Sequence, residues 1–176
     1  SRADVVGMLL RGGYPSVREA PARLRAAWLS DYVERLLGVD AREGGGRLDP
    51  LRLTSVLRLI AANQSGELVK ARIAREAALS AASVTGYLDA LDRLYLTEDL
   101  QPWTVNLTAR EIGRRKVRVA DCGLAAWLCG ASADLLKDVV RGGRTLGAIL
   151  EGFVVGELSS QAGWAETGYR LFHYRD

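Results

Sequence analysis

Histidine and cysteine are almost absent from this sequence, and their scarcity excludes several classes of site. The 176 residues include one histidine, His173, and two cysteines, Cys122 and Cys129. A single histidine rules out a histidine-rich metal cluster and leaves no Cys/His or Ser/His/Asp arrangement to support nucleophilic catalysis. The two cysteines fall on the same side of a predicted helix, so we expect buried, reduced thiols in a cytoplasmic protein rather than a disulfide.

Two longer motifs are also missing. No apolar run reaches the roughly 18 residues that a membrane-spanning helix needs, and the most apolar stretch, 147–158, contains Glu151 and Glu157. We therefore expect no membrane partner. The sequence has no Gly-x-x-x-x-Gly-Lys-Ser/Thr motif, so we expect no ATP site and no other cofactor within this chain. The first residues have no basic leader typical of a secretory signal, and both ends are typical of a segment of a longer protein.

The charge is mildly positive overall but unevenly distributed. The net charge is +3 and the pI is about 9.1. Residues 61–105 carry four basic and six acidic side chains, whereas residues 106–120 carry five basic side chains and one acidic. Because hydrophobic residues make up 48% of the chain, we expect a packed core rather than a disordered chain.

The stretch from Glu67 to Pro102 predicts a helix-turn-helix. Helical spacing over 70–77 is followed by Ser80 or Ser83 as an N-cap, and then by a second amphipathic helix. An extended segment begins at Tyr95, and a further helix over 51–62 precedes the unit. Helix, short strand, helix, helix and hairpin is the order of a winged helix-turn-helix.

The remaining segments predict a mainly α protein of the α+β class. We expect helices over 1–11 and 20–37, the second ending at Gly38, and a strand over 116–120. A short helix over 134–140 should be followed by a loop at Gly142-Gly143 and a long helix capped by Thr145. The alternation over 169–175 predicts a closing strand, in which His173 has a structural role.

Candidate nucleic-acid contacts fall into two groups. The second helix of the helix-turn-helix offers Ser83, Thr85 and Arg93, but Asp89 and Asp92 on the same side repel phosphate. This helix either enters a DNA major groove or packs on another domain, and the aspartates favour packing. The basic segment that follows is the better candidate for phosphate contacts, through Arg110, Arg114, Arg115, Lys116 and Arg118.

Several separated strings together resemble one known family. They are Gly12-Gly13-Tyr14-Pro15, Trp28-Leu29 with Asp31-Tyr32, Ser83-Val84-Thr85 with Tyr87-Leu88, Lys116 with Asp121-Cys122-Gly123-Leu124, Leu150-Glu151 with Phe153-Val154 and Glu157-Leu158, and Tyr174-Arg175-Asp176. In this order the chain resembles the C-terminal half of prokaryotic AAA-type P-loop ATPases that carry a DUF4143 domain.

The resemblance implies three regions. Residues 1–46 would be the end of the ATPase module, 47–120 the winged helix, and 121–176 the truncated start of a restriction-endonuclease-like domain of the PD-(D/E)XK type. ATP and Mg²⁺ would then belong to the parent protein, and the upstream ATPase domain and double-stranded DNA would be the partners. The chain itself would serve interaction or DNA binding rather than catalysis. A stand-alone DNA-binding regulator and a part of a metal-dependent nuclease remain the alternatives.

Glu151 is the candidate acid for that nuclease chemistry. It shares its side of the predicted helix with Val154, Val155 and Leu158, and a carboxylate there needs a partner or a metal ion. Either it holds Mg²⁺, or it pairs with an arginine such as Arg170 or Arg175. The second interpretation is favoured because this sequence lacks the further acids of such a site.

Overall fold

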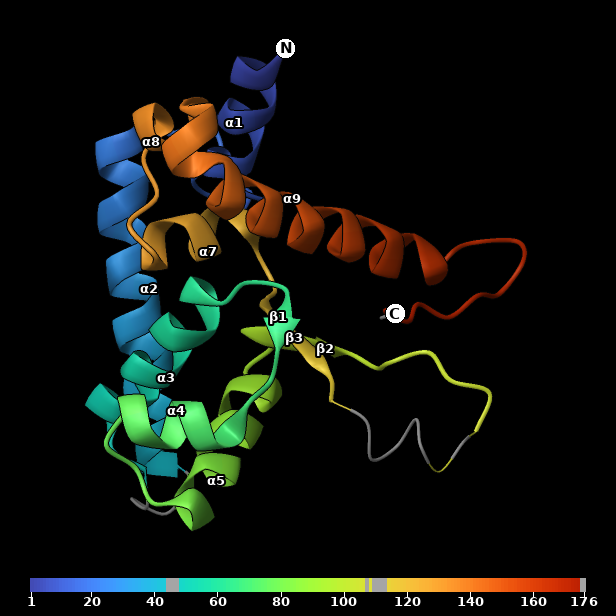
Figure 1. Ribbon diagram of the computed structural model, residues 1–176. Coiled ribbons are helices and arrows are strands. Elements are labelled where there is room, and N and C mark those ends of the chain that lie inside the picture. Colours follow the sequence, from blue (N-terminus) through green and yellow to red (C-terminus); the bar gives the residue numbers. More distant parts are fainter. Residues whose placement is uncertain (44–47, 107, 109–113, 175–176) are drawn as a thin grey trace.

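The computed structural model describes residues 1–43, 48–106, 108 and 114–174 (Figure 1). This part of the chain is mainly helical, with a small three-stranded antiparallel sheet. The predicted α+β class is therefore confirmed. The elements are α1 (Arg2–Arg11), α2 (Ala22–Glu43), α3 (Pro50–Ala62), β1 (Gly66–Glu67), α4 (Lys70–Glu76), α5 (Ala81–Arg93), β2 (Thr97–Leu100), β3 (Lys116–Val119), α7 (Cys122–Leu128), α8 (Ala133–Lys137) and α9 (Val139–Ala162).

The elements from α3 to β3 form a winged helix. The strands lie in the order β1-β3-β2, and β3 pairs antiparallel with both neighbours. Ser80 caps α5 as predicted, because its hydroxyl accepts the backbone N–H of Ser83. The buried side of α5 carries Val84, Tyr87 and Leu91, which join the larger hydrophobic core. The helix-turn-helix prediction is confirmed.

Residues 12–21 connect α1 to α2, and the start of this connection contacts α7. Gly12 has φ 69°, and a Cβ there would lie 2.6 Å from an Asp121 carboxylate oxygen and 3.0 Å from the Gly123 Cα. Only glycine meets both conditions. Asp121 fixes the contact, since it accepts the N–H of Gly13 at 2.6 Å while capping α7 through Leu124 N–H at 2.7 Å. Two of the separated sequence strings are therefore adjacent in space.

The predicted boundaries of α2, α8 and α9 are wrong, and Thr145 does not cap the long helix. Helix α2 does not end at Gly38 but continues to Glu43. Gly142 and Gly143 are not a loop, since α9 begins at Val139 and Asp138 caps it by accepting two backbone N–H groups. Gly142 permits α8 to lie directly against α9, because a Cβ there would be 1.9 Å from the Leu135 carbonyl oxygen. The glycines serve close packing, which composition alone cannot distinguish from a turn.

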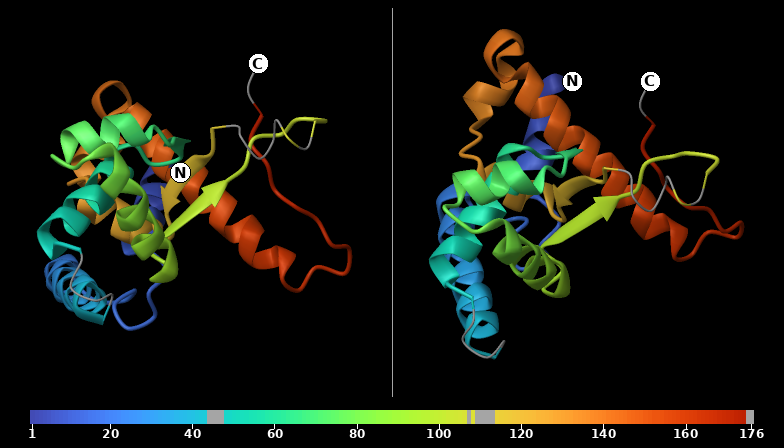
Figure 2. Two further views of the ribbon diagram at one scale, coloured as in Figure 1. Left: turned by 90° about the horizontal axis from the view of Figure 1, so that it is seen from below. Right: turned by 60° about the horizontal axis from the view of Figure 1, so that its bottom comes forward.

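Helix α9 packs on the core through its N-terminal and central turns. Its buried positions are Gly142, Leu146, Ile149 and Gly152, and its C-terminal turns extend beyond the body of the molecule (Figures 1 and 2). The turn after α3 holds this helix, with Ser65 donating to the Ala148 carbonyl at 3.2 Å. A second hydrophobic cluster lies here, formed by α1, α7, α8 and α9.

The predicted strand over 169–175 is wrong for the part that the structure describes. Residues 169–174 make a single parallel bridge, between His173 and Pro102. His173 is 8% exposed, and a ring nitrogen lies 3.0 Å from the Arg114 carbonyl oxygen, so its predicted structural role agrees with its contacts. Arg175 and Asp176 lie outside the described residues. The division at 46 and 120, and the likeness of 121–176 to an endonuclease fold, stay predictions.

Candidate functional site

The described basic residues of the wing, at positions 114–118, form ion pairs with acidic residues from three other elements. Arg118 stands opposite Glu98 in the register of β3 and β2, and the two side chains form an ion pair. The Arg118 side chain is 6% exposed and also donates to the Ala120 carbonyl at 2.8 Å. It is therefore a largely buried cation with two partners, and little of it is exposed to a phosphate.

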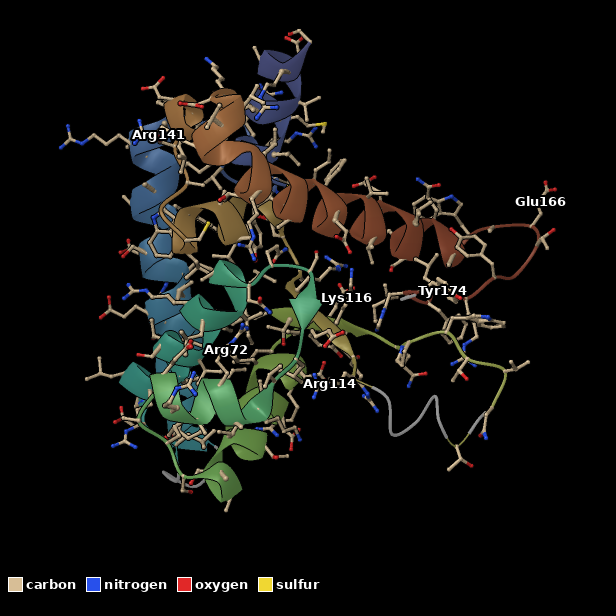
Figure 3. All side chains as sticks on the ribbon, in the orientation of Figure 1. Arg72, Arg114, Lys116, Arg141, Glu166 and Tyr174 are labelled. Carbon is tan, nitrogen blue, oxygen red and sulfur yellow. The ribbon has the colours of Figure 1, made fainter. Side chains whose placement is uncertain are left out.

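The other three described cations of this segment are paired as well. Arg115 contacts Asp99 at 2.7 Å, Lys116 contacts Glu151 at 2.6 Å, and Arg114 contacts Glu67 at 3.5 Å. Arg114 is the most open of them, with 70% of its side chain exposed. Arg114 and Lys116 lie where the chain enters β3 (Figure 3).

These ion pairs neutralise basic side chains that, counted along the sequence, made residues 106–120 strongly positive. Four cations meet four carboxylates, supplied by β1, β2 and α9, so the described part of the basic segment is locally neutral. The paired carboxylates lie at residues 67, 98, 99 and 151, outside residues 106–120, so a count of charge by sequence segment does not include them. Arg110 lies outside the described residues.

The predicted residues on α5 are exposed but make local contacts. Ser83 and Ser80 hydroxyls are 2.7 Å apart at the start of the helix, and Thr85 accepts a hydrogen bond from Lys70 at 3.1 Å. Arg93 lies exposed in the last turn. The exposed side of α5 otherwise carries small and acidic residues: Ala81, Ala82, Gly86, Asp89 and Asp92.

Glu151 has a partner, though not the predicted one. Its carboxylate pairs with Lys116 of β3 rather than with Arg170, so the pair joins α9 to the sheet, and Arg175 lies outside the described residues. Among the described residues, no group of three or more His, Cys, Asp or Glu side chains is placed to hold a metal ion. The donor set around Glu151 therefore does not fit a Mg²⁺ site.

Sequence reasoning missed a groove that shares no lining residue with the wing's ion pairs. It has a volume of about 650 Å³ and runs from α4 across the end of α3 to α8 and α9. Arg72 and Arg144 both line it, as do Leu59, Leu135 and Thr145. The two arginines are far apart in the sequence, so only the packing of α4 near α9 reveals that they share one groove.

Two groups with perturbed pKa values are unsuited to nucleophilic chemistry. Burial raises the pKa of the Cys122 thiol to about 12, with the nearby Asp121 charge as the next cause. Burial also raises the pKa of Tyr14, whose ring contacts Trp28 and Tyr32 at centroid distances of 5.3 and 5.2 Å. Both groups stay protonated at neutral pH and serve packing. Cys122 and Cys129 are free thiols; Cys122 is buried as predicted, whereas Cys129 is only partly buried.

The fold and these contacts define a mainly helical winged-helix protein. None of its described helices has the length and apolar character required to cross a membrane. The chain belongs to the family described as Domain of unknown function (DUF8612), which matches residues 2–135.

Two mycobacterial proteins are distant relatives. They are the uncharacterized protein Rv2008c of Mycobacterium tuberculosis and the uncharacterized protein Mb2031c of Mycobacterium bovis. Each is 29% identical over 153 residues, which cover 86% of this chain and 34% of the relative. The chain thus spans about a third of the length of these curated relatives. No solved structure matches.

Proposed function

We propose that this chain is a protein-interaction module of a longer polypeptide, in which the winged helix binds protein rather than DNA. The observation that supports this proposal is the neutralisation of the wing: each described basic residue from Arg114 to Arg118 pairs with a carboxylate. Affinity for DNA depends on cations that are free to displace counterions from phosphate. Because the described wing cations are already paired with carboxylates, they would release few counterions from DNA, and we expect weak affinity for it.

The polypeptide we propose as the parent is a prokaryotic AAA-type ATPase with a DUF4143 domain. Support comes from the ordered sequence strings, two of which meet at the Gly13–Asp121 contact. The length of the relatives leaves room for an ATPase domain outside the aligned region. ATP and Mg²⁺ would be bound there, and this chain would contact that domain.

The contact between the winged helix and α9 suits a connecting role. The Lys116–Glu151 ion pair and the Ser65–Ala148 hydrogen bond link the two at separate points. A force applied to α9 would therefore reach β3 and the turn after α3 together. We infer that the module transmits movement between the domains on either side of it.

A DNA-binding regulator is the second candidate, favoured by the winged-helix order itself. It requires contacts from Arg93 and Arg110 together with release of the paired wing residues. Replacing Arg114, Arg115 and Lys116 with alanine would then weaken duplex binding. A metal-dependent nuclease has less support, because Glu151 is paired with Lys116 and lies in no metal-ligand cluster of the described residues.

The experiment that tests the proposal supplies the rest of the longer polypeptide as a separate chain. We expect sedimentation velocity to show a one-to-one complex with this 176-residue chain. A Gly-x-x-x-x-Gly-Lys-Ser/Thr motif in the added chain would support the ATPase assignment. Absence of any complex, with both chains folded by circular dichroism, would contradict the proposed interaction.

A further inference from the structure

The groove between α4 and α9 carries two arginines without partners. Among the residues that the structure describes, neither the Arg72 side chain nor the Arg144 side chain has a hydrogen bond or an ion pair. Arg72 is partly buried, and Arg144 is exposed. The Arg72 side chain has lost part of its hydration without gaining a partner, which favours an external anion beside it, and the exposed Arg144 supplies a second cation on the same groove. Arg72 lies on the face shown toward the viewer in Figure 3.

The lining of the groove combines polar and apolar side chains, and this limits what the anion can be. Leu59 and Leu135 line it and are only partly buried, as is Ala148. The volume of about 650 Å³ lies within the range of roughly 300–1,000 Å³ typical of ligand sites and exceeds what a free phosphate requires. The ligand therefore presents both apolar and anionic groups.

The rim of the groove argues against a polyanion. Glu76 of α4 also lines the groove, and its only described partner is the exposed Arg75 at 3.7 Å. A nucleic-acid backbone would bring several phosphates past this carboxylate and would place charge over the leucines. A peptide can place one carboxylate at each arginine and an apolar side chain between them.

We propose that this groove binds an acidic peptide segment, with carboxylates at Arg72 and Arg144 and an apolar side chain on Leu59 and Leu135. The inference rests on the proposed function in one respect, because both assign a protein partner to this chain. It adds the location of the contact and the chemistry of the partner. The groove lies apart from the wing and its ion pairs.

The test measures binding of a fluorescein-labelled synthetic peptide with leucine and glutamate at helical spacing, by fluorescence anisotropy. The variants are Arg72→Ala, Arg144→Ala and their combination in the 176-residue chain. The matched controls are Lys70→Ala on α4, whose side chain contacts Thr85 rather than the groove, and Arg141→Ala on α9. Arg141 also lacks a described partner for its side chain, but it does not line the groove and lies at the outer edge of the molecule (Figure 3).

We expect saturable binding that weakens about threefold for each groove arginine and about tenfold for the pair. The controls should stay within about 1.5-fold of the unmodified chain. A peptide with lysine in place of glutamate should not bind. Equal loss for groove and control variants, no binding of the acidic peptide, or equal binding of the lysine peptide would overturn the inference.

A labelled DNA duplex in the same assay separates the two proposals. Duplex binding that depends on Arg72 and Arg144 would identify nucleic acid as the ligand of the groove. That result would contradict both the acidic-peptide site and the proposed protein-interaction function. If the acidic peptide does not bind but the chain still forms a stable complex with the rest of the polypeptide, the groove is not the point of contact. The proposed protein-interaction function would then still hold. Circular dichroism of each variant confirms that it is folded.

Discussion

Replacing Arg118 with methionine is the sharpest test of whether the wing's cations are structural. Arg118 has 6% of its side chain exposed, pairs with Glu98 across the β2–β3 register, and donates to the Ala120 carbonyl. Methionine keeps the apolar stem within the sheet while removing every donor. The variant therefore isolates the polar interactions from the packing.

The expected loss in the free energy of unfolding depends on how well the remaining partner, Glu98, is solvated after the substitution. Breaking a fully buried ion pair costs about 3–5 kcal/mol, because the remaining charge stays buried. Here the Glu98 side chain is 48% exposed and regains water. The loss is then closer to that of hydrogen bonds to a charged group, about 1.5–3 kcal/mol. We expect the free energy of unfolding to decrease by about 2–3 kcal/mol.

Urea denaturation followed by circular dichroism measures this change. The control is Arg114→Ala, because Arg114 has 70% of its side chain exposed and its ion pair spans 3.5 Å. An exposed pair of this kind contributes about 0–1 kcal/mol. A double-mutant cycle with Glu98→Gln should give a coupling energy of about 1–2 kcal/mol. Equal effects of the Arg118 and Arg114 variants would refute the structural role of Arg118.

Three further predictions concern other parts of the molecule. Gly142→Ala should destabilise the chain by about 1–3 kcal/mol or more through its clash with α8, whereas Gly143→Ala, which has open space around its Cβ, should stabilise it by about 0.5–1 kcal/mol; chemical denaturation of the two variants compares them. The Cys122 thiol, with its pKa raised to about 12, should react with a thiol reagent at pH 8 only after denaturation. Because the unfolded thiol loses its proton first, stability should be constant below about pH 8.5 and fall between there and pH 12. Lys116→Ala and Glu151→Gln should each cost about 0–1 kcal/mol, and no Mg²⁺-dependent DNA cleavage is expected before or after either change; cleavage lost in the Glu151 variant would contradict this account.

The winged helix was predictable because its signals are local. The N-cap at Ser80 and the apolar positions at Val84 and Leu91 depend on spacing within one element. The same reasoning failed at Gly142-Gly143 because a glycine pair reads as a turn from sequence. Its role depends on the Leu135 carbonyl of a neighbouring helix.

The candidate site was harder to predict because it depends on pairing across the fold. The sequence identifies Arg114 to Arg118 as basic, but it does not reveal that their partners are Glu67, Glu98, Asp99 and Glu151. The partners expected for Glu151 by sequence were arginines near the C-terminus, whereas the position of α9 beside the sheet brings Glu151 to Lys116. Charge counted along the chain is therefore a poor guide to charge at a surface.

The salt dependence of DNA binding tests the central claim most directly. Fluorescence anisotropy of a labelled duplex, with this chain titrated at about 50 and 200 mM salt, gives the slope of log K against log salt. If four wing cations contacted phosphate, the slope would be about −3.6. This account predicts no saturable duplex binding tighter than about 10⁻⁴ M and hence no such slope. A slope of about −3 or steeper, abolished by replacing Arg114, Arg115 and Lys116 with alanine, would contradict it.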